Sequence, residues 1–171
     1  MEIVSLVATI TLDGPLDLEV LQKKIEGSEL TKNNGGWLKY RLKPEMRYIA
    51  FYRNGKFLIT GKDLHNSISD VIERVLELII EAGVLRKVKE IEINNIVGKG
   101  KIDYPPTLES FILNNPEKSE YEPEQFPALI FRDWNLTFLF FSTGSTIVTG
   151  AKNIDQLESG FKKFKKLVRS S

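Results

Sequence analysis

The sequence contains no cysteine and only one histidine, His65, among its 171 residues. The lack of cysteine excludes a disulfide framework and a thiolate nucleophile, and a single histidine argues against a His/Cys metal site or a Ser-His-Asp triad. A Gly-rich phosphate loop and a pair of carboxylates at catalytic spacing are also missing. We therefore expect no enzymatic activity, no cofactor, no metal and no small-molecule substrate.

Long apolar runs are absent as well, since none approaches the roughly 20 residues that a membrane helix needs. The first residues, Met1-Glu2-Ile3-Val4, lack the basic and then apolar layout of a signal peptide. We expect an intracellular protein without membrane association. The 24 basic and 23 acidic residues give a net charge of +1, so composition shows no nucleic-acid signature and leaves open only a local basic surface.

What the sequence does contain is an internal repeat. Five stretches of the second half match the first half in register: 93–98 with 3–8 (offset 90), 119–121 with 28–30 (91), 129–132 with 38–41 (91), 141–144 with 52–55 (89) and 149–150 with 60–61 (89). The fall in offset from 91 to 89 places a two-residue deletion between Arg132 and Phe141, where Asp133-Trp134-Asn135 predicts a tightened turn. We place the first copy at residues 1–88 and the second copy at residues 89–171.

Both copies show the same order of predicted elements. A strand is followed by a short helix and then by several strands rich in β-branched and aromatic residues. In the first copy these are residues 3–12, about 16–25, 37–42, 47–52 and 56–60; in the second they are 90–101, about 107–113, 128–132, 137–141 and 146–149. Asn54-Gly55 and Thr143-Gly144 are the predicted hairpin turns before the last strand.

A longer helix ends each copy. Apolar residues recur at helical spacing from Ile68 to Ala82, and Gly83 follows as the stop. The second helix runs from Leu157 to Val168 after a capping box formed by Asn153 and Gln156. This repeated order predicts an α+β fold, with helices on one face of a largely antiparallel sheet. An uncovered sheet face that carries apolar residues is usually a binding surface.

Three stretches of the second copy resemble the C-terminal repeat of the TATA-box-binding protein family, especially its archaeal members: Ile93–Gly98, Ser119–Ile130 and Thr149–Lys152. The middle stretch is long and of unusual composition. The resemblance covers both copies in layout and is close in motif from about Glu90 onward. It implies two pseudo-symmetric repeats that form a saddle, with a continuous curved antiparallel sheet and the helices on the convex face. It also implies binding of A·T-rich double-stranded DNA in the minor groove, bending of that DNA, and recruitment of transcription factor B.

The resemblance assigns DNA contacts within the second copy. The two phenylalanines that enter between base steps fall on Phe126 and Phe141. Because Phe140 and Phe141 face opposite ways in a strand, one of them must leave the core. The polar contacts fall on Asn95 and Thr149; beside them stand the apolar Val97, Leu139 and Ile147, and the phosphate-facing Arg132 and Lys152. A small apolar floor suits A·T pairs, since it would clash with a guanine amino group. A third basic position of the family is Ser145 here, which should weaken contact with the DNA backbone.

The first copy departs further from the family. The asparagine becomes Ser5, the first wedge aligns with Gly35, and the second aligns with Tyr52. Trp37 is a candidate substitute wedge, with core packing as the alternative. The DNA contacts that remain are Val7, Arg41, Lys56, Leu58, Thr60 and Lys62.

An acidic loop before Phe126 is the family's site for transcription factor B. Here it contains Glu122 and Glu124 around Pro123, although a merely solvated loop has the same composition. The last helix bears a basic face, which fits a solvated surface as well as a patch for a partner or flanking DNA: Lys162, Lys163, Lys165, Lys166 and Arg169.

Three functions stay open. The first is a promoter-binding initiation factor, and the second is a divergent paralogue that binds DNA weakly or not at all. The third is a protein-interaction module that reuses the fold. We expect a cytoplasmic, nucleoid-associated protein, or a nuclear one if the source is eukaryotic.

Overall fold

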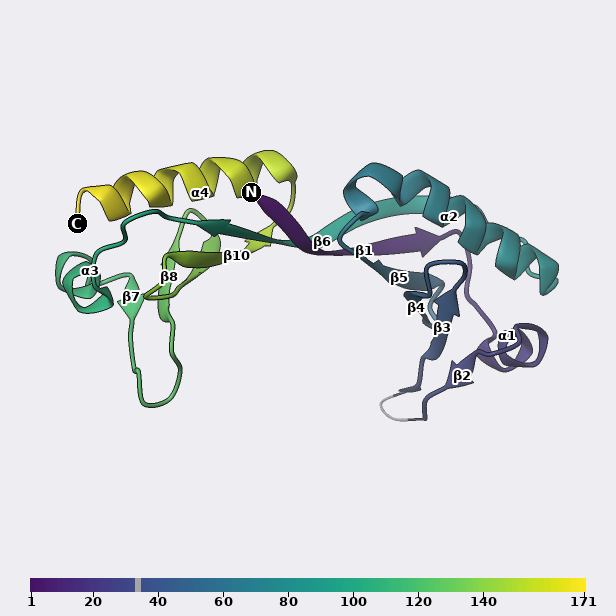
Figure 1. Cartoon of the computed structure of the whole chain (residues 1–171). Helices are drawn as coiled ribbons and strands as arrows, with labels where there is room; N and C mark the ends of the chain where they lie inside the picture. The colour runs from purple at the N-terminus through teal and green to yellow at the C-terminus, as the bar shows by residue number, and fades with distance from the viewer. Residues whose placement is uncertain (33–34) are drawn as a thin grey trace. The chain divides into compact units, whose positions relative to one another are not determined.

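The computed structural model describes residues 1–32 and 35–171, and in them the two copies contain the same elements in the same order (Figure 1). The first copy comprises β1 (Glu2–Leu12), α1 (Leu18–Lys24), β2 (Glu29–Leu30), β3 (Leu38–Leu42), β4 (Arg47–Phe51), β5 (Lys56–Thr60) and α2 (Leu64–Glu81). The second comprises β6 (Val88–Lys101), α3 (Leu108–Asn114), β7 (Ser119–Glu120), β8 (Leu129–Asp133), β9 (Leu136–Phe140), β10 (Ser145–Ala151) and α4 (Ile154–Arg169). The predicted duplication is confirmed.

The strands are hydrogen-bonded in the order β2-β3-β4-β5-β1-β6-β10-β9-β8-β7. Within each copy the pairs β3–β4, β4–β5, β8–β9 and β9–β10 are antiparallel. The α+β fold of two repeats is therefore confirmed. The chain forms two compact units, Leu6–Ile93 and Met1–Ser5 with Asn94–Ser171. We call them the first-copy unit and the second-copy unit.

The two-residue deletion lies at the turn where the offset predicts it. In the first copy, Leu42 pairs with Arg47, so four residues connect β3 to β4. In the second copy, Asp133 pairs with Leu136, so only Trp134 and Asn135 connect β8 to β9. Both of these residues have positive φ, 54° and 58°, which is the geometry of a type I′ hairpin turn.

The core of the second-copy unit is aromatic. Phe111 of α3 packs edge-on against Phe131 of β8 and Phe140 of β9, with ring centroids 5.7 Å apart in both pairs. Phe164 of α4 stacks on Phe138 at 4.5 Å. Both helices thus cover the same face of the strands. Gly100 lets α4 approach closely, since a Cβ there would stand 2.5 Å from the Phe161 ring.

The short helices begin later than predicted because a polar residue caps each of them. Asp17 accepts a hydrogen bond from the Val20 N–H, so α1 starts at Leu18 rather than near Leu16. Thr107 caps α3 in the same way. For α4 the predicted cap is present: Asn153 accepts from the Gln156 N–H at 2.8 Å, and the Gln156 side chain reaches back to the Lys152 N–H. The sequence did not indicate the two-residue strands β2 and β7.

Candidate nucleic-acid interface

The second copy has an open sheet face opposite its helices. Along β9, Phe138 and Phe140 are fully buried, whereas the intervening Leu139 is half-buried. Leu139 pairs with Ile147 on β10 and with Ile130 on β8, so these three side chains share the face that α3 and α4 leave uncovered. Val97 alternates with buried neighbours on β6 in the same way. The open face therefore has a floor of medium-sized apolar side chains.

At one end of this floor, Asn95 and Thr149 lie together. The Asn95 Nδ2 donates to Thr149 Oγ1 at 3.2 Å, and the Gly150 N–H donates to Asn95 Oδ1 at 2.7 Å. The register of β10 against β6 shifts between Val148 and Ala151, as in a β-bulge. The Asn95 amide is thus fixed by a backbone group beside the apolar floor.

At the other end, Phe126 and Phe141 form an aromatic pair, with ring centroids 6.4 Å apart and planes 63° apart. Phe126 is 40% exposed, and Phe141 is half-buried while its neighbour Phe140 is fully buried. A tight turn positions Phe126, because the Glu122 carbonyl accepts hydrogen bonds from the Gln125 and Phe126 N–H groups. The acidic loop and the aromatic pair are therefore one local structure.

The charged residues expected at this face are exposed, and two have partners within the chain. Arg132 forms an ion pair with Glu120 at 2.9 Å, and the Lys152 ammonium donates to the Asn94 carbonyl at 2.5 Å. An exposed ion pair contributes at most about 1 kcal/mol, so Arg132 can exchange Glu120 for another anion. Glu122 and Glu124 are both exposed.

The open face of the first copy differs in its centre. Val7 pairs with Thr60 and Thr9 with Leu58, so the positions expected to contact DNA do share one face. However, Tyr48 and Lys39 occupy the places that Thr137 and Ile130 have in the second copy. Sequence analysis does not assign a role to either residue: Tyr48 lies between the matched stretches, and Lys39 lies within residues 38–41 but replaces the apolar Ile130.

Arg41 lies over the ring of Tyr48, with its Cζ 5.1 Å from the ring centroid, a cation–π contact. Lys56 is exposed, and Tyr52 is half-buried just after β4. Gly35 is exposed with a φ of 83°, and a Cβ there would meet no atom within 4 Å. The first copy therefore presents an aromatic-cationic surface and has no ring at the Phe126 position.

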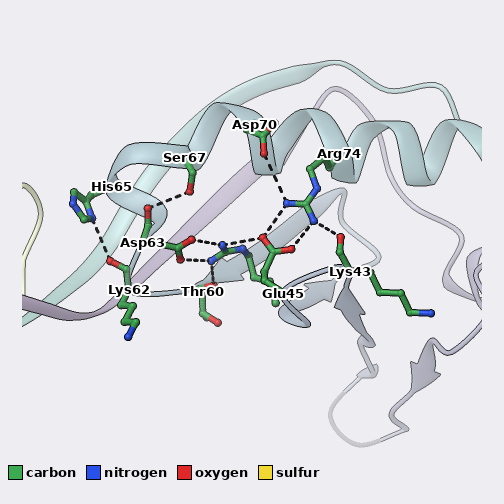
Figure 2. Close-up of polar contacts among 10 residues, drawn as sticks. Lys43, Glu45, Thr60, Lys62, Asp63, His65, Ser67, Asp70 and Arg74 are labelled. Carbon is green, nitrogen blue, oxygen red and sulfur yellow. Dashed lines mark hydrogen bonds and ion pairs between the residues drawn. The ribbon is translucent and has the colours of Figure 1, made fainter.

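A buried arginine, Arg47, binds the Thr60 end of the first copy, and Figure 2 labels its partners Thr60, Asp63 and Glu45. The Arg47 side chain is only 4% exposed; its guanidinium donates to the Thr60 carbonyl at 2.9 Å and to both Asp63 carboxylate oxygens at 3.0 and 2.8 Å. Gly61 leaves the necessary room, because a Cβ there would lie 1.9 Å from the Arg47 Nη1. Glu45 bridges Arg47 at 3.1 Å and Arg74 of α2 at 2.6 Å. This set is called the Arg47 cluster below.

We expect Asp63→Ala to lower the free energy of unfolding by about 2 to 3 kcal/mol. A buried ion that loses its partner costs about 3–5 kcal/mol, and the remaining contact with Glu45 reduces that loss. The second copy supplies a matched control, since Leu136 and Asn153 occupy the positions of Arg47 and Asp63. Arg47→Leu combined with Asp63→Asn should stay within about 1 kcal/mol of the unmodified protein. Urea unfolding measures both; equal midpoints for Asp63→Ala and the unmodified protein would contradict the expectation.

The Arg47 cluster also predicts a pH dependence. The hydrogen bond from Arg74, aided by the backbone and by Arg47, lowers the pKa of Glu45 from 4.5 to about 2. A carboxylate whose pKa is lowered on folding stabilises the fold above its unfolded pKa, and this contribution is lost as the pH falls from about 4.5 to 2. Because the Glu45 side chain is 34% exposed, solvent screening limits the effect to about 1 kcal/mol. Acid titrations of unfolding should therefore converge for Glu45→Gln and the unmodified protein below pH 2 and separate above pH 5.

Such a fold, with two copies of an α/β unit that each leave one strand face open, defines a double-repeat α+β protein. The family model "Transcription factor TFIID (or TATA-binding protein, TBP)" matches residues 1–82 and again residues 90–171. The TATA-box-binding protein of Aeropyrum pernix is 32% identical over 95% of this chain and 81% of its own length. That of Sulfolobus acidocaldarius is 32% identical over 98% and 87%. The structure of Methanococcus jannaschii TBP superposes with a TM-score of 0.87 at 27% identity, covering 99% of this chain and 98% of that one.

The chain therefore belongs to the TATA-box-binding protein family, as the residues of the second copy indicated, and is of the archaeal type. This is a family of transcription factors and not of enzymes. Within residues 1–32 and 35–171, no helix is both long and apolar enough to cross a membrane.

Proposed function

We propose that this protein binds A·T-rich DNA in the minor groove, bends it, and recruits transcription factor B. The observation that carries the proposal is the ring pair of the exposed Phe126 and the half-buried Phe141 beside an apolar sheet face. An apolar ring at a sheet edge can replace the stacking that a kinked base step loses. The relatives named above are TATA-box-binding proteins, which supports the same function for this chain.

The chemistry of the second copy favours A·T pairs. The minor-groove edge of an A·T pair presents only acceptors, and the Asn95 and Thr149 groups can donate to them. The floor formed by Val97, Leu139 and Ile147 leaves no partner for a guanine amino group. Arg132 and Lys152 flank this floor and supply charge for phosphates.

The first copy favours a second candidate, a divergent paralogue that binds DNA weakly. Gly35 offers no ring, and Ser5 is shorter than the asparagine at the matching position of the second copy. Val7, Leu58 and Thr60 still share a face, with Arg41 and Lys56 as the cationic residues. Gel shifts with a TATA duplex, with and without transcription factor B, distinguish the candidates: submicromolar binding of the duplex alone supports the first, and binding only with transcription factor B supports the second.

For the partner loop we expect Glu122→Arg with Glu124→Arg to weaken the ternary complex with transcription factor B at least about tenfold, since like-charge contacts at an interface cost several kcal/mol. Both side chains are exposed, and the turn uses only the Glu122 carbonyl, so the fold and binding of the duplex alone should be unchanged. Glu158→Arg, also exposed but on α4 and outside the turn, is the matched control. Normal recruitment by the double variant would remove the partner assignment.

A further inference from the structure

The second-copy unit contains a hollow that no step of the proposed DNA binding uses. It has a volume of ≈ 350 Å³ and lies among the residues that follow α3, the β8–β9 turn and the last turns of α4. Its wall is formed by residues 114–118 with Phe131, Asp133, Trp134 and Leu167. We call it the Trp134 pocket. Its size suits one large apolar side chain with part of its backbone.

The floor of this pocket is aromatic and rigid. The Trp134 ring packs against Phe131 at 5.8 Å and against Phe138 at 5.9 Å. Phe131 and Phe138 are fully buried, while Trp134 is half-buried and lines the hollow. An indole held in this way offers contact area that loses little conformational freedom when a ligand binds.

The choice of tryptophan is not explained by the turn. A type I′ turn favours Asn and Gly, which tolerate positive φ, whereas a left-handed conformation costs a bulky L-residue about 1–2 kcal/mol. Trp134 adopts a φ of 54° despite this. A strained backbone at a bulky residue indicates that the indole side chain is retained for packing or binding rather than for the turn.

Charge beside the pocket is positive. Residues 159–171 include no acidic residue. The exposed side of α4 in this range bears four basic residues: Lys162, Lys163, Lys166 and Arg169. The Lys163 ammonium lies 5.8 Å from the centroid of the Trp134 ring. Of the carboxylates in the wall, Asp133 is paired with Lys118 at 2.6 Å, and Glu117 is exposed. An anionic ligand would meet lysines on the α4 side of the hollow.

The first copy has a hollow at the corresponding place but with different chemistry. It is lined by residues 24–27 together with Tyr40 and Leu78, the counterparts of Phe131 and Leu167, and it has no tryptophan. The helix beside it, α2, exposes acidic residues instead: Asp70, Glu73, Glu77 and Glu81. The repeat thus supplies the hollow twice, and only the second copy combines an indole with a basic helix.

We propose that the Trp134 pocket binds an acidic peptide segment of another protein, with one large apolar side chain seated on Trp134 and carboxylates along Lys163 and Lys166. None of its wall residues belongs to the proposed DNA face or to the acidic loop. The interaction is therefore independent of DNA binding.

The test uses Trp134 as its own reporter. Trp37→Phe leaves Trp134 as the only tryptophan of the full chain. The probe is a synthetic 15-residue peptide of Asp, Glu, Ser and Gly with one central Phe. We expect a saturable change in Trp134 fluorescence with a micromolar Kd, and at least about tenfold weaker binding when the Phe of the peptide is replaced by Ala.

Variants of the chain separate the pocket from general electrostatics, with binding followed by anisotropy of the labelled peptide. Trp134→Asn, which suits the turn, and Lys163→Glu with Lys166→Glu should each weaken binding at least about tenfold. Lys24→Glu with Lys43→Glu at the first-copy hollow is the matched control and should change it less than twofold. Binding of the TATA duplex should be unaffected by all of them, so failure here leaves the proposed function standing.

Four results would overturn the proposal. The first is that the peptide does not bind, and the second is that it binds equally well to Trp134→Asn. The chain self-associates in sedimentation experiments, and the pocket variants abolish this, so the occupant is a second copy. Alternatively, the lysine variants weaken binding of a duplex as strongly as binding of the peptide, so the basic helix contacts nucleic acid.

Discussion

Replacing Phe126 and Phe141 together with alanine is expected to weaken binding of a TATA duplex by about tenfold to thousandfold. Unstacking a base step costs a few kcal/mol, and the inserted rings offset that cost; each 1.4 kcal/mol is about a factor of ten in affinity. The two rings form one T-shaped pair at 6.4 Å. Their contributions should therefore be non-additive, with either single variant losing more than half of the total free energy.

The fold should tolerate these substitutions, since Phe126 is 40% exposed and Phe141 is only half-buried. Tyr104→Ala is the matched control for loss of an exposed aromatic ring, because Tyr104 is 99% exposed and belongs to neither proposed site. Circular dichroism checks the fold, and gel shifts measure affinity. If the double variant binds the duplex as Tyr104→Ala does, the wedge assignment is wrong.

The fold was predictable because the sequence contains an internal repeat and because local turn and capping motifs mark several of its elements. The change in repeat offset located the shortened β8–β9 turn, and the Asn153–Gln156 pair located the start of α4. Short-range chemistry determines both features, so they are legible without tertiary contacts. The strands β2 and β7 are too short to show periodicity, since each pairs only two residues with its neighbour.

The site could be predicted only in part. Family motifs led to the second-copy residues, and the structure places their apolar members on one open face; their contact with DNA stays a prediction. The Arg47 cluster escaped sequence reasoning because Arg47, Asp63 and Arg74 meet only through the tertiary fold. An arginine at the start of a strand is expected to have a solvated side chain, whereas the Arg47 side chain is buried by the tertiary fold. Trp134 was noted only as part of a turn, since the sequence does not show a hollow beside it.

The difference between the copies predicts an asymmetric bend. A protein with a ring pair in each repeat can kink DNA at two places, whereas here only the second copy has Phe126 and Phe141, and the first offers Gly35 and Tyr52. Unstacking on the Gly35 side would go largely uncompensated, at a few kcal/mol per step. Binding should therefore be weaker than is usual for the family by about tenfold to thousandfold, and the bend should be concentrated at the second copy.

Restoring the ring and the amide that the first copy lacks should strengthen binding and add a bend on its side. Gly35→Phe with Ser5→Asn is expected to strengthen binding of the TATA duplex at least about tenfold and to increase its bend. A side chain has room at Gly35, but the φ of 83° there imposes strain of about 1–2 kcal/mol on any L-residue. Gly35→Ala with Ser5→Asn, which has the same strain and the same asparagine without the ring, is the matched control, so the gain from stacking is the difference in affinity between the Phe and Ala variants. Energy transfer between dyes at the two ends of a labelled duplex reports the total bend, and 2-aminopurine fluorescence at single steps locates each kink.

Two equal kinks with the unmodified protein, or equal affinity for the Phe and Ala variants, would refute the asymmetry, because either result means that the first copy already has a wedge or needs none.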